Sequence, residues 1–164
     1  MKAGDLVKYL SRVVLILGPG RQRGWFRGIE VGTETMWSTS NELRIPKVLV
    51  VNGLDKEHTK FNDILKQAKE RFGKNVFPMQ LPVNAGPDFN QIVDVLRREL
   101  ITYQADGSGK FSENELPEDL VSEVDGLHSE LIEYVAESDD SLLERYFEHG
   151  NLSEEEMRGG IHHA

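Results

Sequence analysis

The chain has 164 residues, and its 38% hydrophobic and 29% charged content is typical of one globular domain or two small ones. The formal net charge is −9. Residues 1–27 hold six basic and one acidic side chains, a net of +5, whereas the rest hold 13 basic and 27 acidic side chains, a net of −14. This acidic charge argues against general nucleic-acid binding through the surface of residues 28–164, and we expect no direct DNA binding. It favours a basic protein partner, although solubility alone explains it equally well.

The sequence contains no cysteine, which excludes a disulfide framework and fits a reducing compartment. No run approaches the roughly 18 apolar residues that a membrane span needs. The apolar run at 13–17 is too short for a signal peptide. We therefore expect a cytoplasmic protein with no membrane partner.

The first 27 residues combine a predicted strand with a glycine-rich turn. Residues 13–17 are all apolar, and Gly18-Pro19-Gly20 ends the run. Glycine-rich turns after strands often bind phosphate, which makes residues 18–24 a candidate phosphate loop. The turn lacks the Gly-Lys-Ser/Thr ending, and with it the phosphate-binding lysine and the magnesium-binding hydroxyl, so this interpretation is not favoured.

A helix and a strand are predicted next. Residues 33–43 have a partial apolar face, with Thr33 as the expected N-cap. Residues 44–51 end in four consecutive apolar side chains, a pattern typical of a parallel strand buried on both faces. Because Asn52-Gly53 is a turn signal, Asn52 and Asp55 follow the carboxyl end of this strand, where ligands bind in open α/β sheets.

The middle of the chain predicts one helix and several strands. Residues 60–72 have apolar side chains at intervals of three and four, which predicts an amphipathic helix that Gly73 ends. Residues 76–83 contain two prolines, which confine them to an edge or irregular strand. Residues 91–103 have the spacing of a helix but the β-branched content of strands. Residues 111–116 are predicted to return as an antiparallel strand.

The C-terminal part predicts three helices. A long helix at 117–137 has a buried apolar stripe and an acidic outer face. The run Asp139-Asp140-Ser141 is expected to cap a second helix, whose apolar face includes Phe147 and which Gly150 ends. A capping box of the form Ser-x-x-Glu at Ser153 begins the last helix, which a Gly-Gly pair weakens.

No metal site is predicted. The turn at 106–109 is too short and too poor in carboxylates for a calcium loop. His58 is typical of an exposed turn, and His128 lies on or near the apolar stripe of the long helix. His162 and His163 are adjacent, so on a helix their side chains diverge.

Several blocks of sequence occur in the order found in a known family. The Asn-Gly-Leu-Asp turn at 52–55 resembles the Asn-Lys-x-Asp guanine-recognition motif of GTP-binding proteins. Further matching blocks lie at 28–37, 44–46, 55–61, 78–83 and 92–96. Together they resemble translation elongation factor G, the ribosomal translocation GTPase.

The resemblance implies an α/β fold: a partial P-loop NTPase (translational GTPase) G domain at 28–75 and an α+β inserted subdomain at 76–164. It favours two strands, or one bent strand, at 91–103. Residues 1–27 do not match. The family carries its phosphate loop, first switch and Asp-x-x-Gly motif before the point matched by Gly28, and its last nucleotide motif is expected beyond Ala164. We therefore hypothesise a gene truncated or shifted in frame upstream, which nucleotide sequencing tests.

The resemblance also implies GTP or GDP binding through Asn52 and Asp55. A carboxylate can accept from guanine N1–H and the 2-amino group, while an amide can donate toward O6 and N7. Gly53 replaces the family's lysine, whose stem covers the guanine face, and this removes roughly 1–2 kcal/mol of apolar contact. We therefore expect weak or absent nucleotide binding, no Mg²⁺ site, no catalytic residue and no GTPase activity by the chain alone.

The implied partner is the ribosome, through its stalk protein and an acidic helix. Glu123, Glu130 and Glu133 are the predicted partner surface, and a merely solvated helix face is the alternative. A third interpretation is a decayed fragment without independent function, because the strand around Val48 needs neighbours on both sides.

Overall fold

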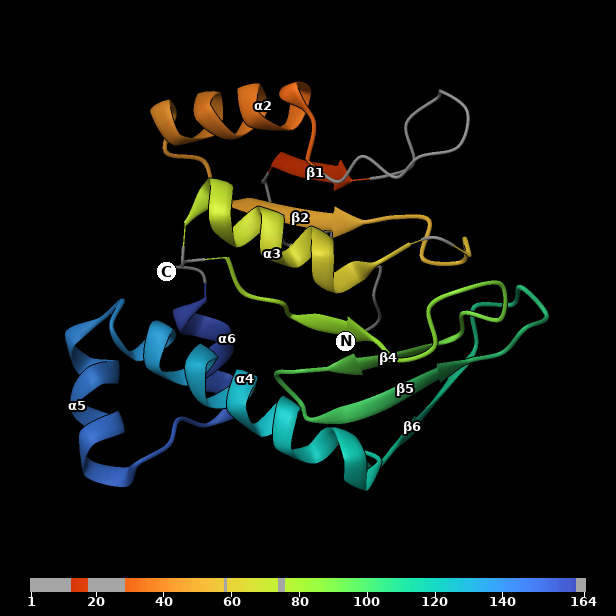
Figure 1. Cartoon of the computed structure of the whole chain (residues 1–164). Coiled ribbons are helices and arrows are strands. Elements are labelled where there is room, and N and C mark those ends of the chain that lie inside the picture. The colour runs from red at the N-terminus through yellow and green to blue at the C-terminus, as the bar shows by residue number, and fades with distance from the viewer. Residues whose placement is uncertain (1–12, 18–28, 58, 74–75, 162–164) are drawn as a thin grey trace. The chain divides into compact units, whose positions relative to one another are not determined.

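The computed structural model describes residues 13–17, 29–57, 59–73 and 76–161. Its fold is mixed α/β, with five helices and an antiparallel four-stranded sheet among these residues (Figure 1). The expected α/β class is confirmed. The chain divides into two compact units, residues 1–73 and 74–164, which are described separately below.

The first unit contains a two-stranded parallel sheet and two helices. Strand β1 (Val13–Leu17) pairs in parallel with β2 (Lys47–Val51), and Leu15 lies opposite Leu49. Helix α2 (Val31–Glu42) precedes β2, and α3 (Phe61–Phe72) follows it. The strand predicted at 13–17 and the helix predicted at 60–72 are confirmed, and Gly73 ends α3 with a φ of +98°.

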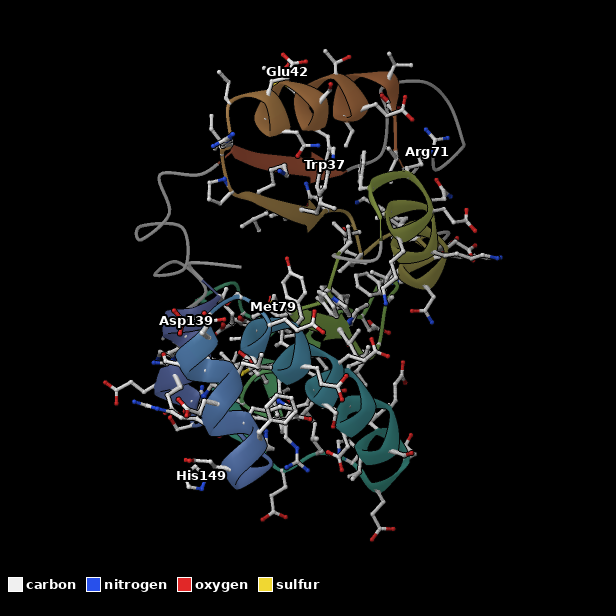
Figure 2. All side chains as sticks on the ribbon, turned by 90° about the vertical axis from the view of Figure 1, so that its left-hand side faces the viewer. Trp37, Glu42, Arg71, Met79, Asp139 and His149 are labelled. Atoms are coloured by element: carbon white, nitrogen blue, oxygen red, sulfur yellow. The ribbon has the colours of Figure 1, made fainter. Side chains whose placement is uncertain are left out.

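Aromatic stacking holds α2 against α3. The Trp37 and Phe72 rings stack with centroids 4.2 Å apart and planes inclined by 14°. Lys47 Nζ lies 4.8 Å from the Trp37 ring centroid, a cation–π contact from the start of β2. Glu34 and Arg71 add an ion pair between the helices, and Figure 2 shows Trp37 on the sheet-facing side of α2.

Two predictions for this unit are wrong. Strand β2 is not buried on both faces, because Val50 exposes 39% of its surface and the other side chains of β2 are only half-buried. An apolar run identifies a strand, but other elements decide whether its faces are covered. Thr33 is not the N-cap: the Glu30 carbonyl accepts from the Thr33 and Glu34 N–H groups, so α2 begins two residues earlier.

The second unit begins with a sheet in the order β3-β4-β5-β6. The strands are β3 (Gln80–Pro82), β4 (Gln91–Asp94), β5 (Glu99–Tyr103) and β6 (Phe111–Asn114). β3 lies at the edge, as its prolines predict. Residues 91–103 form two strands, because a tight turn separates them: Arg98 has a φ of +56°, and the Asp94 carboxylate accepts from the Arg97 N–H at 3.0 Å.

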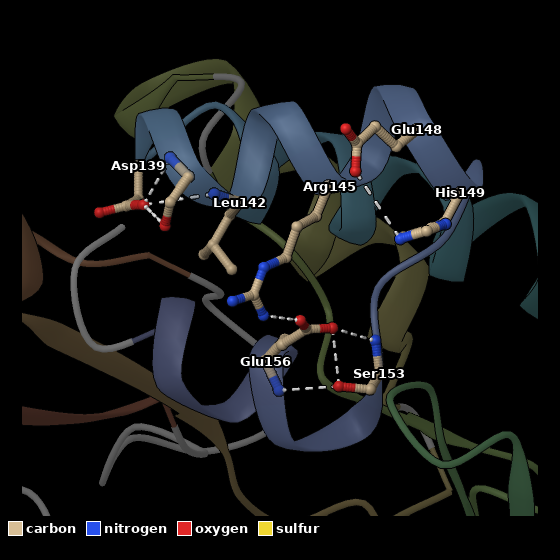
Figure 3. Close-up of polar contacts among 8 residues, drawn as sticks. Asp139, Leu142, Arg145, Glu148, His149, Ser153 and Glu156 are labelled. Atoms are coloured by element: carbon tan, nitrogen blue, oxygen red, sulfur yellow. Dashed lines mark hydrogen bonds and ion pairs between the residues drawn. The ribbon is translucent and has the colours of Figure 1, made fainter.

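Three helices follow the sheet, and their packed faces form a core. They are α4 (Glu118–Ala136), α5 (Asp140–His149) and α6 (Glu154–Gly160). The buried cluster between them consists of Leu131, Ile132, Val135, Ala136, Leu152 and Met157. The caps predicted for α5 and α6 are confirmed. Within the run 139–141 it is Asp139 that accepts, from the Ser141 and Leu142 N–H groups, and Ser153 forms the capping box with Glu156 (Figure 3).

Phe147 does not belong to the buried face of α5, contrary to the prediction. It is 77% exposed, whereas Leu142, Leu143 and Tyr146 pack against the core. Each residue of a helix is rotated by about 100° from the one before it, so Phe147 lies past the edge of the face that ends at Tyr146.

The Gly-Gly pair in α6 allows a close approach between helices. A Cβ at Gly160 would lie 2.7 Å from Leu142 Cδ1 and closer still to Val135 Cγ1. A Cβ at Gly159 would meet nothing within 4 Å. Only the second glycine is therefore required for packing.

Candidate functional site

The first candidate site is the turn at 52–59, which follows the carboxyl end of β2. Because β1 and β2 are parallel, their carboxyl ends lie at one edge of the sheet, the edge where α/β sheets bind ligands. Asn52 and Asp55 both lie on this turn and are both exposed. The structure thus brings the two predicted base-contacting residues to one surface turn.

Gly53 organises the turn. It is buried and has a φ of +79°, the left-handed region that favours glycine. Its carbonyl accepts from the Lys56 N–H at 3.1 Å and from Thr59 Oγ1 at 2.6 Å. The conformation of the turn therefore explains why residue 53 is a glycine.

Sequence reasoning missed Thr59, which is only 8% exposed and binds back to residue 53. A threonine just before a helix is ordinarily interpreted as a cap. No local spacing indicates a bond to a carbonyl six residues earlier. Only the folded path of the turn reveals it.

The Asn52 side chain is oriented by its neighbour. Asn52 Oδ1 accepts from the Gly53 N–H at 2.8 Å. This bond occupies the amide oxygen and leaves the NH₂ group as the donor. A donor at this position suits an acceptor on the ligand, such as a carbonyl oxygen or a ring nitrogen.

Asp55 supplies the opposite chemistry. Its Oδ2 pairs with Lys56 Nζ at 2.8 Å, and the hydrogen bond from Lys56 lowers the pKa of the Asp55 carboxyl below its usual value. The group is therefore an ionised acceptor at neutral pH. The two side chains are 54% and 61% exposed, so the pair is weak and a ligand could displace Lys56.

The second candidate site is the outer face of α4. Glu123, Glu130 and Glu133 are all exposed. With Asp119 they recur at intervals of three, four and seven, which places them along one side of the helix. The opposite side carries the buried residues Val124, Leu131, Ile132 and Val135. The three predicted partner-binding glutamates therefore form one acidic stripe.

Contacts with the β4–β5 turn set the rotation of α4. Asp125 is half-buried and forms an ion pair with Arg98, and His128 Nδ1 lies 3.0 Å from the Val95 carbonyl oxygen. These two residues anchor the helix to the sheet. Asp125 therefore lies outside the acidic stripe.

Other predicted features lie beyond what the structure describes or form no site. The candidate phosphate loop at 18–24, His58 and the His162-His163 pair lie outside the described residues. Within the described ranges, no group of three or more His, Asp or Glu side chains could hold a metal ion. No helix in those ranges is both long and apolar enough to cross a membrane.

No protein-family model matches the chain. Among solved structures, the chain is similar to the crystal structure of ttk003000868 from Thermus thermophilus, with a TM-score of 0.72 and 24% sequence identity. The likeness shows the fold. It covers 91% of this chain and 21% of that one, so this chain spans about a fifth of the length of the solved protein.

Proposed function

We propose that the chain is part of an elongation factor G-like translational GTPase, a protein that binds GTP and drives ribosomal translocation. The observation that carries the proposal is the turn after β2, where Asn52 offers a donor and Asp55 an acceptor on one exposed surface. The family order of the sequence blocks supports it.

Guanine fits this pair of side chains. The Asn52 NH₂ group can donate toward O6 and N7, while the Asp55 carboxylate can accept from N1–H and the 2-amino group. Adenine presents a donor at position 6 and an acceptor at N1, so both contacts would oppose it. Asp55 therefore sets the identity of the base in this proposal.

Affinity is expected to be low in this chain. Gly53 has no stem to cover the base, and Lys56 competes for the Asp55 carboxylate. Phosphoryl transfer also requires a backbone phosphate cradle, its lysine and a bound Mg²⁺. No motif for these groups is recognisable in the sequence, so we expect negligible GTP hydrolysis by the chain alone.

Nuclear magnetic resonance titration tests base recognition at low affinity. GDP is expected to shift the backbone resonances of residues 52–56, whereas ADP leaves them unchanged. Asp55→Asn should abolish the difference between the two nucleotides. The matched control is Asp106→Asn, an exposed aspartate in another turn. Equal shifts with GDP and ADP contradict base recognition, and GDP binding at micromolar concentration or tighter contradicts the expected weakness.

The acidic stripe of α4 supports a second candidate function, docking on the ribosomal stalk protein. Glu123, Glu130 and Glu133 would attract a basic surface and accelerate the encounter. Since the groups are exposed, the attraction should weaken as salt rises. This function needs no nucleotide and is assigned to the second unit alone.

Calorimetric titration with the C-terminal domain of the bacterial stalk protein tests docking. We expect saturable, salt-sensitive binding that is lost when Glu123, Glu130 and Glu133 are all replaced by lysine. The control replaces three exposed glutamates elsewhere in the unit: Glu144, Glu148 and Glu155. Unchanged binding by the first variant contradicts the assignment. No binding by the folded chain favours the decayed-fragment interpretation.

A further inference from the structure

The Asn52-Gly53 pair has a chemical reactivity that base recognition does not use. It is the one Asn-Gly pair in the sequence. We propose that Asn52 is a self-modification site, where the Gly53 backbone nitrogen attacks the Asn52 side-chain amide and deamidates it in the folded chain. No other protein is required for the reaction.

The geometry brings the reacting groups together. The Gly53 nitrogen lies 2.8 Å from Asn52 Oδ1. Since a C=O bond is about 1.23 Å long, the nitrogen is no more than about 4 Å from Asn52 Cγ. Reacting atoms in a near-attack arrangement are about 3–3.5 Å apart, so a small rotation of the Asn52 side chain suffices.

The surroundings favour the attack. Gly53 has no Cβ to crowd its nitrogen. Its carbonyl is held by Lys56 and Thr59, so the residue keeps its position while the Asn52 side chain moves. Asn52 is exposed and Gly53 is buried, so water and hydroxide reach the reacting groups from the side of Asn52.

The reaction balances with water as the only co-reactant. Hydroxide removes the Gly53 amide proton, the nitrogen bonds to Asn52 Cγ, and the bond from Cγ to Nδ2 breaks. The departing NH₂ group takes a proton from water and leaves as ammonia, which regenerates hydroxide, and a five-membered imide ring remains. Water then opens the ring at either carbonyl, which gives aspartate or isoaspartate at position 52. No oxidation or reduction takes place.

The product has a new negative charge three positions from Asp55. The amide donor is replaced by a carboxylate, which repels the O6 and N7 acceptors of guanine. This consequence, and only this consequence, rests on the proposed function. Modification would therefore switch off base recognition in a time-dependent way.

The chain contains its own matched control. Asn151 is also exposed, and its Oδ1 accepts from the Leu152 N–H at 2.9 Å. The two sites share this hydrogen bond and differ in the residue that follows. Leu152 is 5% exposed, and its branched, buried side chain crowds the nitrogen and fixes it in the core. We expect no deamidation at Asn151 over the same period.

Peptide mapping by mass spectrometry tests the proposal on the full chain. The protein is incubated at neutral and mildly alkaline pH, with and without urea. We expect the peptide containing position 52 to gain about 1 Da in the folded chain, as the amide becomes a carboxyl group. The rate should rise with hydroxide concentration. Gly53→Ala should slow it at least about tenfold, because the added carbon crowds the attack.

The comparison with the urea sample shows whether the fold protects Asn52 from deamidation. If Asn52 stays intact in the folded chain for the time in which urea converts it fully, the fold protects the site and the proposal is wrong. Equal conversion of Asn52 and Asn151 in the folded chain also contradicts it. The mass change needs no nucleotide, so it stands or falls separately from guanine recognition. The consequence is tested by Asn52→Asp, which should lose the GDP-induced resonance shifts.

Discussion

At the scale of single residues, Gly160 determines how closely α6 approaches α4 and α5. Gly160→Ala would push a methyl group into Val135 and Leu142, and overpacking of this kind costs about 1–3 kcal/mol. We expect a lower free energy of unfolding in urea titrations. The control is Gly159→Ala, where a Cβ meets open space and helix propensity gains up to about 1 kcal/mol. Equal effects of the two substitutions contradict this account.

Glu156 makes the stability of the C-terminal helices depend on pH. Hydrogen bonds from the Ser153 N–H and hydroxyl, at 2.8 and 2.7 Å, together with Arg145, lower the pKa of the Glu156 carboxyl from 4.5 to about 2 (Figure 3). The folded state therefore favours the ionised form. This contribution is fully present above about pH 4.5 and is lost as the pH falls toward 2.

Glu156→Gln keeps an acceptor at this position but removes the charge. We expect the wild-type chain to exceed this variant in unfolding free energy at neutral pH, and the difference to shrink between pH 4.5 and about pH 2. Urea titrations across that range measure it. The neighbouring Glu155→Gln, which takes no part in these bonds, should show no such trend. A difference that stays constant with pH would rule out the titration of Glu156 as its cause.

At the scale of elements, two glycines have no close neighbours, so replacing them tests the effect of backbone conformation on stability without a change in packing. Gly126 lies in the middle of α4, and Gly107 lies in the β5–β6 turn with a φ of +71°. Neither has a neighbour within 4 Å of an added Cβ. Gly126→Ala should raise the unfolding free energy by up to about 1 kcal/mol, because alanine favours the helix.

Gly107→Ala should have the opposite sign and cost about 1 kcal/mol, because the left-handed region disfavours a side chain. Thermal and urea unfolding of the two variants measure both effects. Stabilisation by Gly107→Ala would show that the turn relaxes away from its positive φ. Destabilisation by Gly126→Ala would show that α4 needs its glycine for another reason.

At the scale of the whole molecule, the two units have unequal cores. The buried hydrophobic residues described in the first unit are Ile29, Ile64 and Ala68, whereas the second unit contains the larger cluster around Val135 and Met157. Both tryptophans, Trp25 and Trp37, belong to the first unit. Tryptophan fluorescence therefore reports on that unit alone, while far-ultraviolet circular dichroism reports on both.

We expect the fluorescence transition in urea to precede the main loss of circular dichroism, because among the described residues the first unit buries fewer apolar side chains than the second. Gly160→Ala should shift only the later transition. Coincident transitions by both probes, in the wild-type chain and the variant, would show that the two units unfold as one cooperative body.

Local sequence determined many of the helices of this protein and the residues at which they begin and end. The apolar spacing of α3 and α4, the caps at Asp139 and Ser153, and the left-handed Gly150 follow from interactions within a few residues, so pattern predicts them. The position of Asn52 and Asp55 is predicted in the same way, because a strand that ends in a turn places both side chains at its carboxyl end; their role in base recognition stays a prediction.

Tertiary structure decided the rest. Pattern alone left 91–103 open between a helix and strands; the turn at Arg98 and strand pairing with β3 and β6 make it two strands. The exposure of Val50 and Phe147 depends on which faces other elements cover, and the bond from Thr59 to Gly53 depends on the path of the turn. These features depend on the folded path of the chain and on which elements pack together, and the spacing of residue types along the sequence does not reveal either.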